Sequence, residues 1–160
     1  MRAMSGLKAR LQSDLTESIR AQDPVRSATL RMALTSVRSA EVAGQVAREL
    51  DDEEVLAVLG REAKKRREAA EAFDDAGRTE LADRERAELQ VLQGYLPAAL
   101  SDEELEALVA EEVAAAAAAG ATGNPAMGRV MKAVQPRVAG RADGGRVAAE
   151  VRRQLSASAG

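Results

Sequence analysis

Apolar residues recur along most of the chain at the spacing of a helix. Leu7, Leu11, Leu15 and Ile19 follow one another at intervals of four, and this stripe predicts a first helix that starts near Ser5. No segment alternates with the period of two that indicates a strand. Apolar spacing and capping residues divide the chain into about seven helices, so we predict an all-α fold.

Local signals place the helix boundaries of the first part of the chain. Asp23 and Pro24 can cap and open a second helix. The acidic residues 51–54 suit the start of a third, because they complement its dipole. A fourth helix ends at residues 94–97. Since short loops imply antiparallel neighbours, we predict an N-terminal four-helix bundle-like domain over residues 1–96.

The remaining residues, 97–160, are predicted to form a small C-terminal three-helix domain that begins at Pro97. Ser101 and Glu104 have the spacing of a capping box at the start of its first helix. The next helix starts at Asn124 and is expected to end at Pro136, because proline interrupts helical hydrogen bonding. The last one starts at residues 143–145.

Composition narrows the classes of function. The chain of 160 residues is 46% apolar and 31% charged, with one Phe, one Tyr, no Cys and no His. These absences exclude thiol nucleophiles, Ser–His mechanisms and thiolate or imidazole metal sites. We therefore expect no metal, no cofactor and no self-contained catalysis. Without a long apolar segment, we also expect a soluble cytoplasmic protein that does not cross a membrane.

Charge is unevenly distributed in the C-terminal domain. Residues 98–123 contain six acidic residues and no basic one, whereas residues 124–155 contain seven basic residues and two acidic ones. This pattern predicts a polarised domain. Six basic residues are candidates for binding an anion: Arg129, Lys132, Arg137, Arg141, Arg146 and Arg153.

Two interpretations of these basic residues remain open. Helical spacing places Arg129 and Lys132 opposite the apolar face of their helix, so they are expected to point to solvent. Glu150, however, lies four residues from Arg146 and three from Arg153, so intrahelical ion pairs can occupy that face. With few aromatic residues for base stacking, an RNA ligand would be held through its phosphates and shape. DNA is not expected as a partner.

A second basic segment, residues 61–68, contains Glu62 and Arg66 on the apolar face of the third helix. They are four residues apart, with the acid first, which is the favourable order for an ion pair. A half-buried structural pair is the simpler interpretation, and a functional site is the alternative. Lys64, Lys65 and Arg67 are expected to face solvent.

Several segments together resemble the GatB/YqeY family, notably "GRTELADRERAELQVLQGYLP" at 77–97 and "AMGRVMKAVQPRVAGRADGGRV" at 126–147. The most specific positions are Tyr95, Leu96 and Pro97, followed by a motif that contains Gly128, Asp143 and Gly144. The resemblance implies an N-terminal helical bundle and a three-helix tail similar to that of GatB, a component of the tRNA-dependent amidotransferase. In that enzyme the tail contacts the tRNA away from the chemistry.

The resemblance makes Lys132, Arg141 and Arg146 candidate phosphate contacts. Asp143 is expected to cap a helix and Gly140 and Gly144 to form turns. Close helix packing is an alternative to ligand binding as the reason for Gly128. Our leading hypothesis is a non-catalytic accessory protein whose tail binds structured RNA, most simply tRNA.

Two other functions follow from the same residues. A protein–protein adaptor would dock a partner on the acidic face at 101–112 or on the N-terminal bundle. A carbon–nitrogen ligase with glutamine as amido-N-donor is the label that the resemblance carries. The chain lacks the catalytic cradle of GatB and any glutaminase signature, so this label describes the related enzyme rather than this chain.

Overall fold

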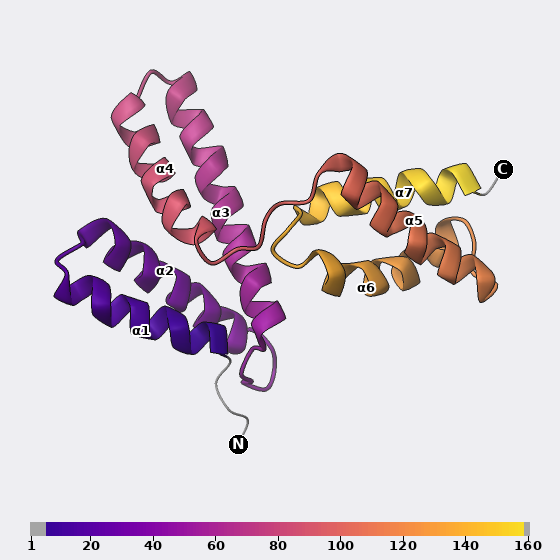
Figure 1. The fold of residues 1–160 in the computed structure, drawn as a ribbon, viewed down its shortest axis with the longest axis horizontal. Helices are drawn as coiled ribbons and strands as arrows, with labels where there is room; N and C mark the ends of the chain where they lie inside the picture. Colours follow the sequence, from indigo (N-terminus) through magenta and orange to yellow (C-terminus); the bar gives the residue numbers. More distant parts are fainter. Residues whose placement is uncertain (1–5, 159–160) are drawn as a thin grey trace. The chain divides into compact units, whose positions relative to one another are not determined.

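The computed structural model describes residues 6–158, and within that range all the regular secondary structure is helical (Figure 1). Ser5, where the first helix was expected to start, lies outside it. The all-α prediction is confirmed, since these residues form seven α-helices, one 3₁₀ helix and no strand. The elements are α1 (Gly6–Arg20), α2 (Pro24–Glu41), α3 (Asp52–Asp75), α4 (Thr79–Gln93), α5 (Asp102–Ala118), η1 (Asn124–Ala126), α6 (Met127–Val138) and α7 (Gly144–Ser158).

The caps predicted at Asp23 and Ser101 are confirmed, and Asp51 caps a third helix start. The Asp23 carboxylate accepts a hydrogen bond from the Arg26 amide at 3.1 Å. Asp51 and Ser101 each form a capping box with the glutamate three residues later. Each box supplies partners for amides that have no acceptor within the helix. Local sequence therefore determines where α2, α3 and α5 begin.

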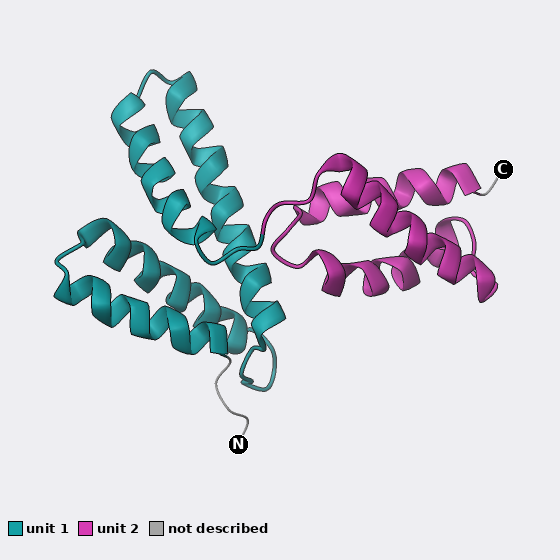
Figure 2. Cartoon of the chain, viewed as in Figure 1, with its two compact units in different colours: residues 1–97 teal, residues 98–160 magenta. Residues whose placement is uncertain are grey.

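The chain divides into two compact units, which are described separately: residues 1–97 are unit 1 and residues 98–160 are unit 2 (Figure 2). Pro97 is the last residue of unit 1, whereas the sequence suggested it as the first of the second domain. All the residues of each candidate site belong to one unit.

Unit 1 consists of two helical hairpins, α1–α2 and α3–α4 (Figure 1). Its core is made by α1, α2, the first half of α3 and the end of α4. Farther along the second hairpin, Ala70 and Ala82 are buried but do not belong to this core. The two hairpins are therefore packed together at one end and diverge toward their turns.

The Tyr95-Leu96-Pro97 motif secures the end of α4 to the first hairpin. The Tyr95 hydroxyl donates a hydrogen bond to the Asp14 carboxylate on α1. The Arg10 guanidinium lies 4.7 Å from the centre of the Tyr95 ring. Burial, together with the neighbouring Asp14, raises the pKa of Tyr95. These contacts account for Tyr95 as a structural residue.

A buried ion-pair cluster holds the segment between α2 and α3. The Lys8 ammonium is 2.8 Å from a carboxylate oxygen of Glu41 and 2.9 Å from one of Glu49. Glu41 also accepts a hydrogen bond from the Leu50 amide. Burial alone would lower the pKa of Lys8, but the hydrogen bonds to Glu41 and Glu49 outweigh it and raise that pKa. Opposite charges thus compensate each other inside the unit.

Unit 2 is a three-helix arrangement of α5, α6 and α7 around an aliphatic core. Val130 and Val134 of α6, with Val151 of α7, are fully buried in it. The expected end of the helix at Pro136 is wrong, because α6 continues to Val138. Pro136 lies on the exposed side, where water can satisfy the carbonyl that loses its partner, and burial of Val138 holds the last turn.

Candidate functional site

Four of the six basic candidates in unit 2 are already paired with acidic residues inside that unit. Arg137 bridges α6 to α5, with nitrogen–oxygen distances of 2.7 Å to Glu111 and 2.9 Å to Glu112. Arg153 lies 2.6 Å from Glu150 on its own helix and 3.5 Å from Glu106 on α5. The prediction of a polarised domain is therefore wrong. The acidic and basic residues are separated along the sequence, but in the folded unit α5 places its acidic side chains against the basic side chains of α6 and α7.

Arg141 and Arg146 support the backbone before α5. The Arg141 guanidinium donates to the Ala98 carbonyl at 3.1 Å, and Arg146 donates to the Leu100 carbonyl at 3.1 Å. Arg146 also pairs with Asp102 at 2.6 Å, and Arg141 is 3.9 Å from Glu104. Both side chains are half-buried. Each satisfies a carbonyl of the segment that leads into α5, which gives both side chains a structural role.

The same ion pairs involve most of the acidic side chains of the face at 101–112. Five of its six acidic side chains have a basic partner within unit 2, and Glu103 is the exception among them. A partner protein that uses this face would have to compete with these arginines. The acidic face is therefore a weaker docking surface than the sequence suggested.

Three basic side chains of unit 2 remain without an ion pair to any described residue: Arg129 and Lys132 on α6, and Arg152 on α7. All three are exposed. Arg152 was missed by sequence reasoning, although the sequence carried a signal. No acidic residue lies three or four positions from any of the three.

Gly128 is next to Arg129 and one helical turn before Lys132, and no close contact requires glycine there. A Cβ built on Gly128 would meet nothing within 4 Å, so close helix packing, one of the two alternatives for this glycine, is wrong. Glycine inside a helix costs about 1 kcal/mol relative to alanine. Gly128 and Lys132 are four residues apart, which places them on the same exposed face. This face offers bare backbone next to positive charge.

In the turn before α7, the roles predicted for Asp143 and Gly140 are confirmed, and the role predicted for Gly144 is not. The Asp143 carboxylate accepts a hydrogen bond from the Gly145 amide at 3.3 Å, in the role of a cap. Gly140 has φ of 72°, which favours glycine, so its role in the turn is confirmed. Gly144 instead is the first residue of α7, and its φ is not positive. Because Asp143 already binds an amide here, this turn is not a free anion site.

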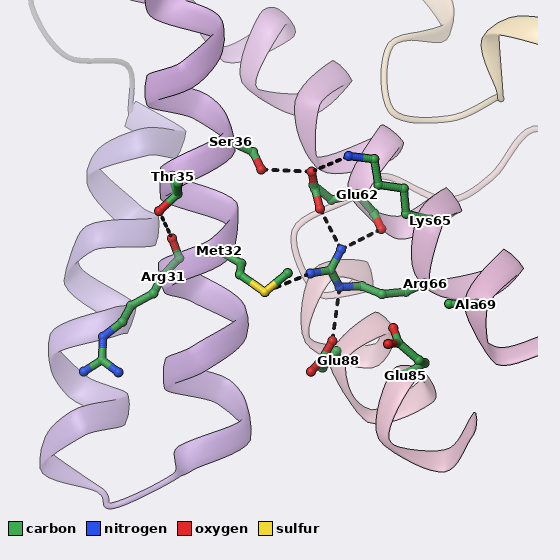
Figure 3. A pocket seen from close by; sticks show the side chains of 10 residues that line it. All are labelled: Arg31, Met32, Thr35, Ser36, Glu62, Lys65, Arg66, Ala69, Glu85 and Glu88. Atoms are coloured by element: carbon green, nitrogen blue, oxygen red, sulfur yellow. Dashed lines mark hydrogen bonds and ion pairs between the residues drawn. The ribbon is translucent and has the colours of Figure 1, made fainter. Parts of the chain in front are cut away.

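The Glu62–Arg66 pair lies at the base of a cleft in unit 1 of about 540 Å³ (Figure 3). Residues of α2, α3 and α4 line this cleft, which we call the unit 1 cleft. Its lining residues are Arg31, Met32, Thr35, Ser36, Glu62, Lys65, Arg66, Ala69, Glu85 and Glu88.

The predicted ion pair is present and more buried than expected. A guanidinium nitrogen of Arg66 lies 2.6 Å from a Glu62 carboxylate oxygen, and the two side chains are 4% and 9% exposed. Ser36 of α2 also donates to Glu62, at 2.9 Å. Burial alone would raise the pKa of Glu62, but the hydrogen bonds from Ser36 and Arg66 hold it below its ordinary value. Lys65, expected to be simply solvated, approaches Glu62 to 3.3 Å.

The Arg66 guanidinium does not use all of its hydrogen-bond donors. Its Nε has no hydrogen-bond partner and is buried, although a Glu88 oxygen lies 3.4 Å away. One Nη faces the sulfur of Met32 at 3.5 Å, which is a weak acceptor. Sequence reasoning found Glu62 and Arg66 but missed Met32 and Glu88. No local spacing connects residues of α2 and α4 to α3.

One family model matches nearly the whole chain, including most of unit 1 and the 127–147 motif of unit 2. The model for Yqey-like protein aligns with residues 8–155. The chain belongs to the YqeY-like protein family. The matched residues include the buried residues of both hydrophobic cores and both candidate sites of this YqeY-like protein.

The chain is also similar to fungal proteins. It is 32% identical over 96 residues to an uncharacterized protein of Schizosaccharomyces pombe, an alignment that covers 59% of this chain and 76% of the relative. It is 29% identical over 109 residues to "Altered inheritance of mitochondria protein 41, mitochondrial" of Eremothecium gossypii, covering 68% and 56%. The protein with that name in Lachancea thermotolerans is 29% identical over 88 residues, covering 55% and 46%. The chain thus spans about half of the two mitochondrial relatives.

Residues 6–158 contain neither a metal-binding cluster nor a membrane-spanning helix. In residues 6–158, no group of three or more Asp or Glu side chains is arranged to hold a metal ion. Within the same range, no helix combines the length and apolar character needed to span a bilayer. The candidate sites of the YqeY-like protein are therefore the exposed cations of unit 2 and the unit 1 cleft.

Proposed function

We propose that this YqeY-like protein is a non-catalytic accessory protein whose tail, unit 2, contacts the phosphates of structured RNA such as tRNA. The observation that carries the proposal is the group of three exposed cations without ion pairs, Arg129, Lys132 and Arg152. A cation that is not neutralised by its own protein is the group that a phosphate can bind at least cost. The carbon–nitrogen ligase activity implied by the resemblance forms no part of the proposal.

The paired arginines have a different role in this proposal. Arg137, Arg141, Arg146 and Arg153 hold α5 against α6 and α7, so they shape the tail without contributing free charge. The number of phosphate contacts is then about three. Three contacts correspond to a slope of about 2–3 in the dependence of log affinity on log salt, and to weak binding at physiological salt.

Gly128 supports the same face. With no side chain at this position, a phosphate group can approach the helix backbone next to Lys132. The open space around Gly128 explains how a residue that weakens the helix fits a binding surface. Recognition of this kind reads backbone and shape, since the described part of unit 2 has no aromatic residue for base stacking.

The test is a triple substitution of the three cations by Gln, measured with fluorescently labelled tRNA across a series of salt concentrations. We expect the affinity to fall and the salt slope to approach zero. The matched control replaces Arg20, Arg38 and Arg61 of unit 1 by Gln, which removes the same charge from exposed positions that make no ion pair with a described residue. Equal weakening in both triple variants, or no weakening in the tail variant, would refute the proposal.

A further inference from the structure

One edge of the Arg66 guanidinium in the unit 1 cleft lacks a good acceptor. On this edge, Nε is buried and makes no hydrogen bond to a described residue, and its ion-pair contact with Glu88 is 3.4 Å long. The adjacent Nη2 donates to the Met32 sulfur at 3.5 Å, and sulfur is a weak acceptor (Figure 3). Nη1, by contrast, is satisfied by the Glu62 carboxylate and carbonyl. Because an unsatisfied buried donor is costly, a stronger acceptor on this edge would stabilise unit 1.

The charges around this edge favour an acceptor that is neutral. Three basic and three acidic residues line the cleft: Arg31, Lys65, Arg66, Glu62, Glu85 and Glu88. An added anion on the free edge would lie beside the Glu88 carboxylate, which would repel it. A neutral oxygen carries no such cost. The edge therefore fits a neutral oxygen acceptor.

Met32 is the side chain that is placed to supply this oxygen. Its sulfur already contacts Nη2, and Met32 lines the cleft and is 48% exposed, so a small oxidant can reach it. Oxidation of a methionine to its sulfoxide adds a polar oxygen to the sulfur, and the chain has no Cys that would compete for the oxidant. The sulfur–nitrogen distance of 3.5 Å exceeds the roughly 2.9 Å of an N–H···O bond, so an oxygen on that sulfur comes within reach of the edge.

The other described methionines lie in the opposite kind of environment. Met127 and Met131 are partly buried and pack against the core of unit 2. A sulfoxide at either position would place a polar group against aliphatic side chains, which is how methionine oxidation usually damages a protein. Met32 is not among the described core residues of unit 1. Oxidation of Met32 therefore avoids this loss of packing.

We propose that Met32 is a reversible oxidation site, and that its sulfoxide oxygen accepts hydrogen bonds from Arg66 and so stabilises unit 1. The oxidant is a peroxide. With hydrogen peroxide, the sulfur lone pair attacks one oxygen, the oxygen–oxygen bond breaks and a sulfur–oxygen bond forms. The proton of the transferred oxygen passes to the departing hydroxide, which leaves as water. The sulfur loses two electrons and the peroxide gains two, and the site is independent of the phosphate contacts proposed for unit 2.

The first test isolates Met32 from the other described methionines. In the full chain, Met127→Leu and Met131→Leu conserve volume and leave Met32 as the only described methionine. The matched control carries Met32→Leu in addition. Both proteins are treated with hydrogen peroxide, and mass spectrometry of their peptides measures the sulfoxide at Met32.

Urea unfolding followed by Tyr95 fluorescence then measures the stability of unit 1. Oxidation should raise the urea midpoint and lower the unfolding equilibrium constant about tenfold, because hydrogen bonds from a charged donor are stronger than neutral ones. The Met32→Leu control should not change, and a methionine sulfoxide reductase should restore the original midpoint. In the oxidised protein, the Arg66 Nε–H signal in nitrogen-15 NMR should shift and exchange more slowly with water.

A second test needs no oxidant, because Gln carries a neutral carbonyl oxygen in place of the sulfoxide. Met32→Gln should give a more stable unit 1 than Met32→Leu. In the Glu62→Gln/Arg66→Met background this difference should vanish, since the guanidinium is gone. The matched control compares Ile19→Gln with Ile19→Leu on α1, a position that is also 48% exposed, and no gain from Gln is expected there.

Each alternative result contradicts the proposal. A lower urea midpoint when mass spectrometry finds the Met32 sulfoxide would show that the added oxygen disrupts unit 1. No sulfoxide at Met32 under conditions that oxidise Met127 and Met131 in the wild type would show that oxidants do not reach this sulfur. An unchanged Arg66 Nε–H signal would show that Glu88 already satisfies this donor. An equal gain from Gln at Ile19, or without Arg66, would show that the guanidinium is not involved, and these Gln variants remain informative if the Leu variants of unit 2 are unstable.

Discussion

Replacing Arg66 by Met tests whether the buried ion pair of unit 1 has the energetics that its geometry implies. The substitution keeps an unbranched apolar side chain but removes the charge that lies 2.6 Å from Glu62. Glu62 would then remain buried with two donors, the Ser36 hydroxyl at 2.9 Å and the Lys65 ammonium at 3.3 Å. Breaking a buried pair costs about 3–5 kcal/mol when the remaining charge is stranded. With two donors left, we expect about 2–4 kcal/mol.

The pH dependence follows from the lowered pKa of Glu62. A carboxylate whose pKa is lowered by folding stabilises the folded state above its unfolded pKa of about 4.3, and this stability is lost as pH falls through the folded pKa. Without Arg66, the folded pKa of Glu62 rises. The difference in unfolding free energy between wild type and Arg66→Met should therefore be largest near neutral pH and shrink in acid.

Urea unfolding followed by the fluorescence of Tyr95 reports on unit 1, because Tyr95 is the only Tyr and the chain has no Trp. The double variant Glu62→Gln/Arg66→Met is the control. It removes both charges, and replacement of a whole buried pair by neutral residues is often neutral or stabilising, so most of the lost stability should return. A loss below about 0.5 kcal/mol in Arg66→Met, or no recovery in the double variant, would refute the reasoning.

Three further predictions concern positions outside that pair. Lys8→Met should destabilise unit 1 by about 3–5 kcal/mol, because it leaves the buried Glu41 carboxylate without its cation. In the wild type the pKa of Lys8 is raised, so its contribution to stability should persist below pH about 10 and disappear as pH rises through that raised pKa. Urea unfolding at a series of pH values checks both expectations. Gly128→Ala should raise the unfolding free energy of unit 2 by up to about 1 kcal/mol, since the new methyl group meets nothing, and lower stability in a thermal melt would contradict the open environment. Tyr95→Phe should cost about 1–2 kcal/mol through loss of the hydrogen bond to Asp14, and an unchanged urea midpoint in circular dichroism would exclude that role.

Local sequence was sufficient for the helices and for contacts within a single helix. The stripe of Leu7, Leu11 and Leu15, and the caps at Asp23 and Ser101, depend on neighbours within a few residues, so their consequences can be predicted without a fold. Glu62 and Arg66 are four residues apart on one helix, and their pairing was predictable for the same reason.

The candidate sites depended on contacts between helices, which the sequence pattern does not contain. Arg137 and Glu111 are far apart in the chain, and only the packing of α5 on α6 brings them within 2.7 Å. The same packing removes most of the predicted basic surface and leaves Arg129, Lys132 and Arg152 exposed without ion pairs to described residues. Helix spacing determined which face each charge occupies, but Coulomb pairing requires a partner at short range, and that distance is set only when the helices pack together.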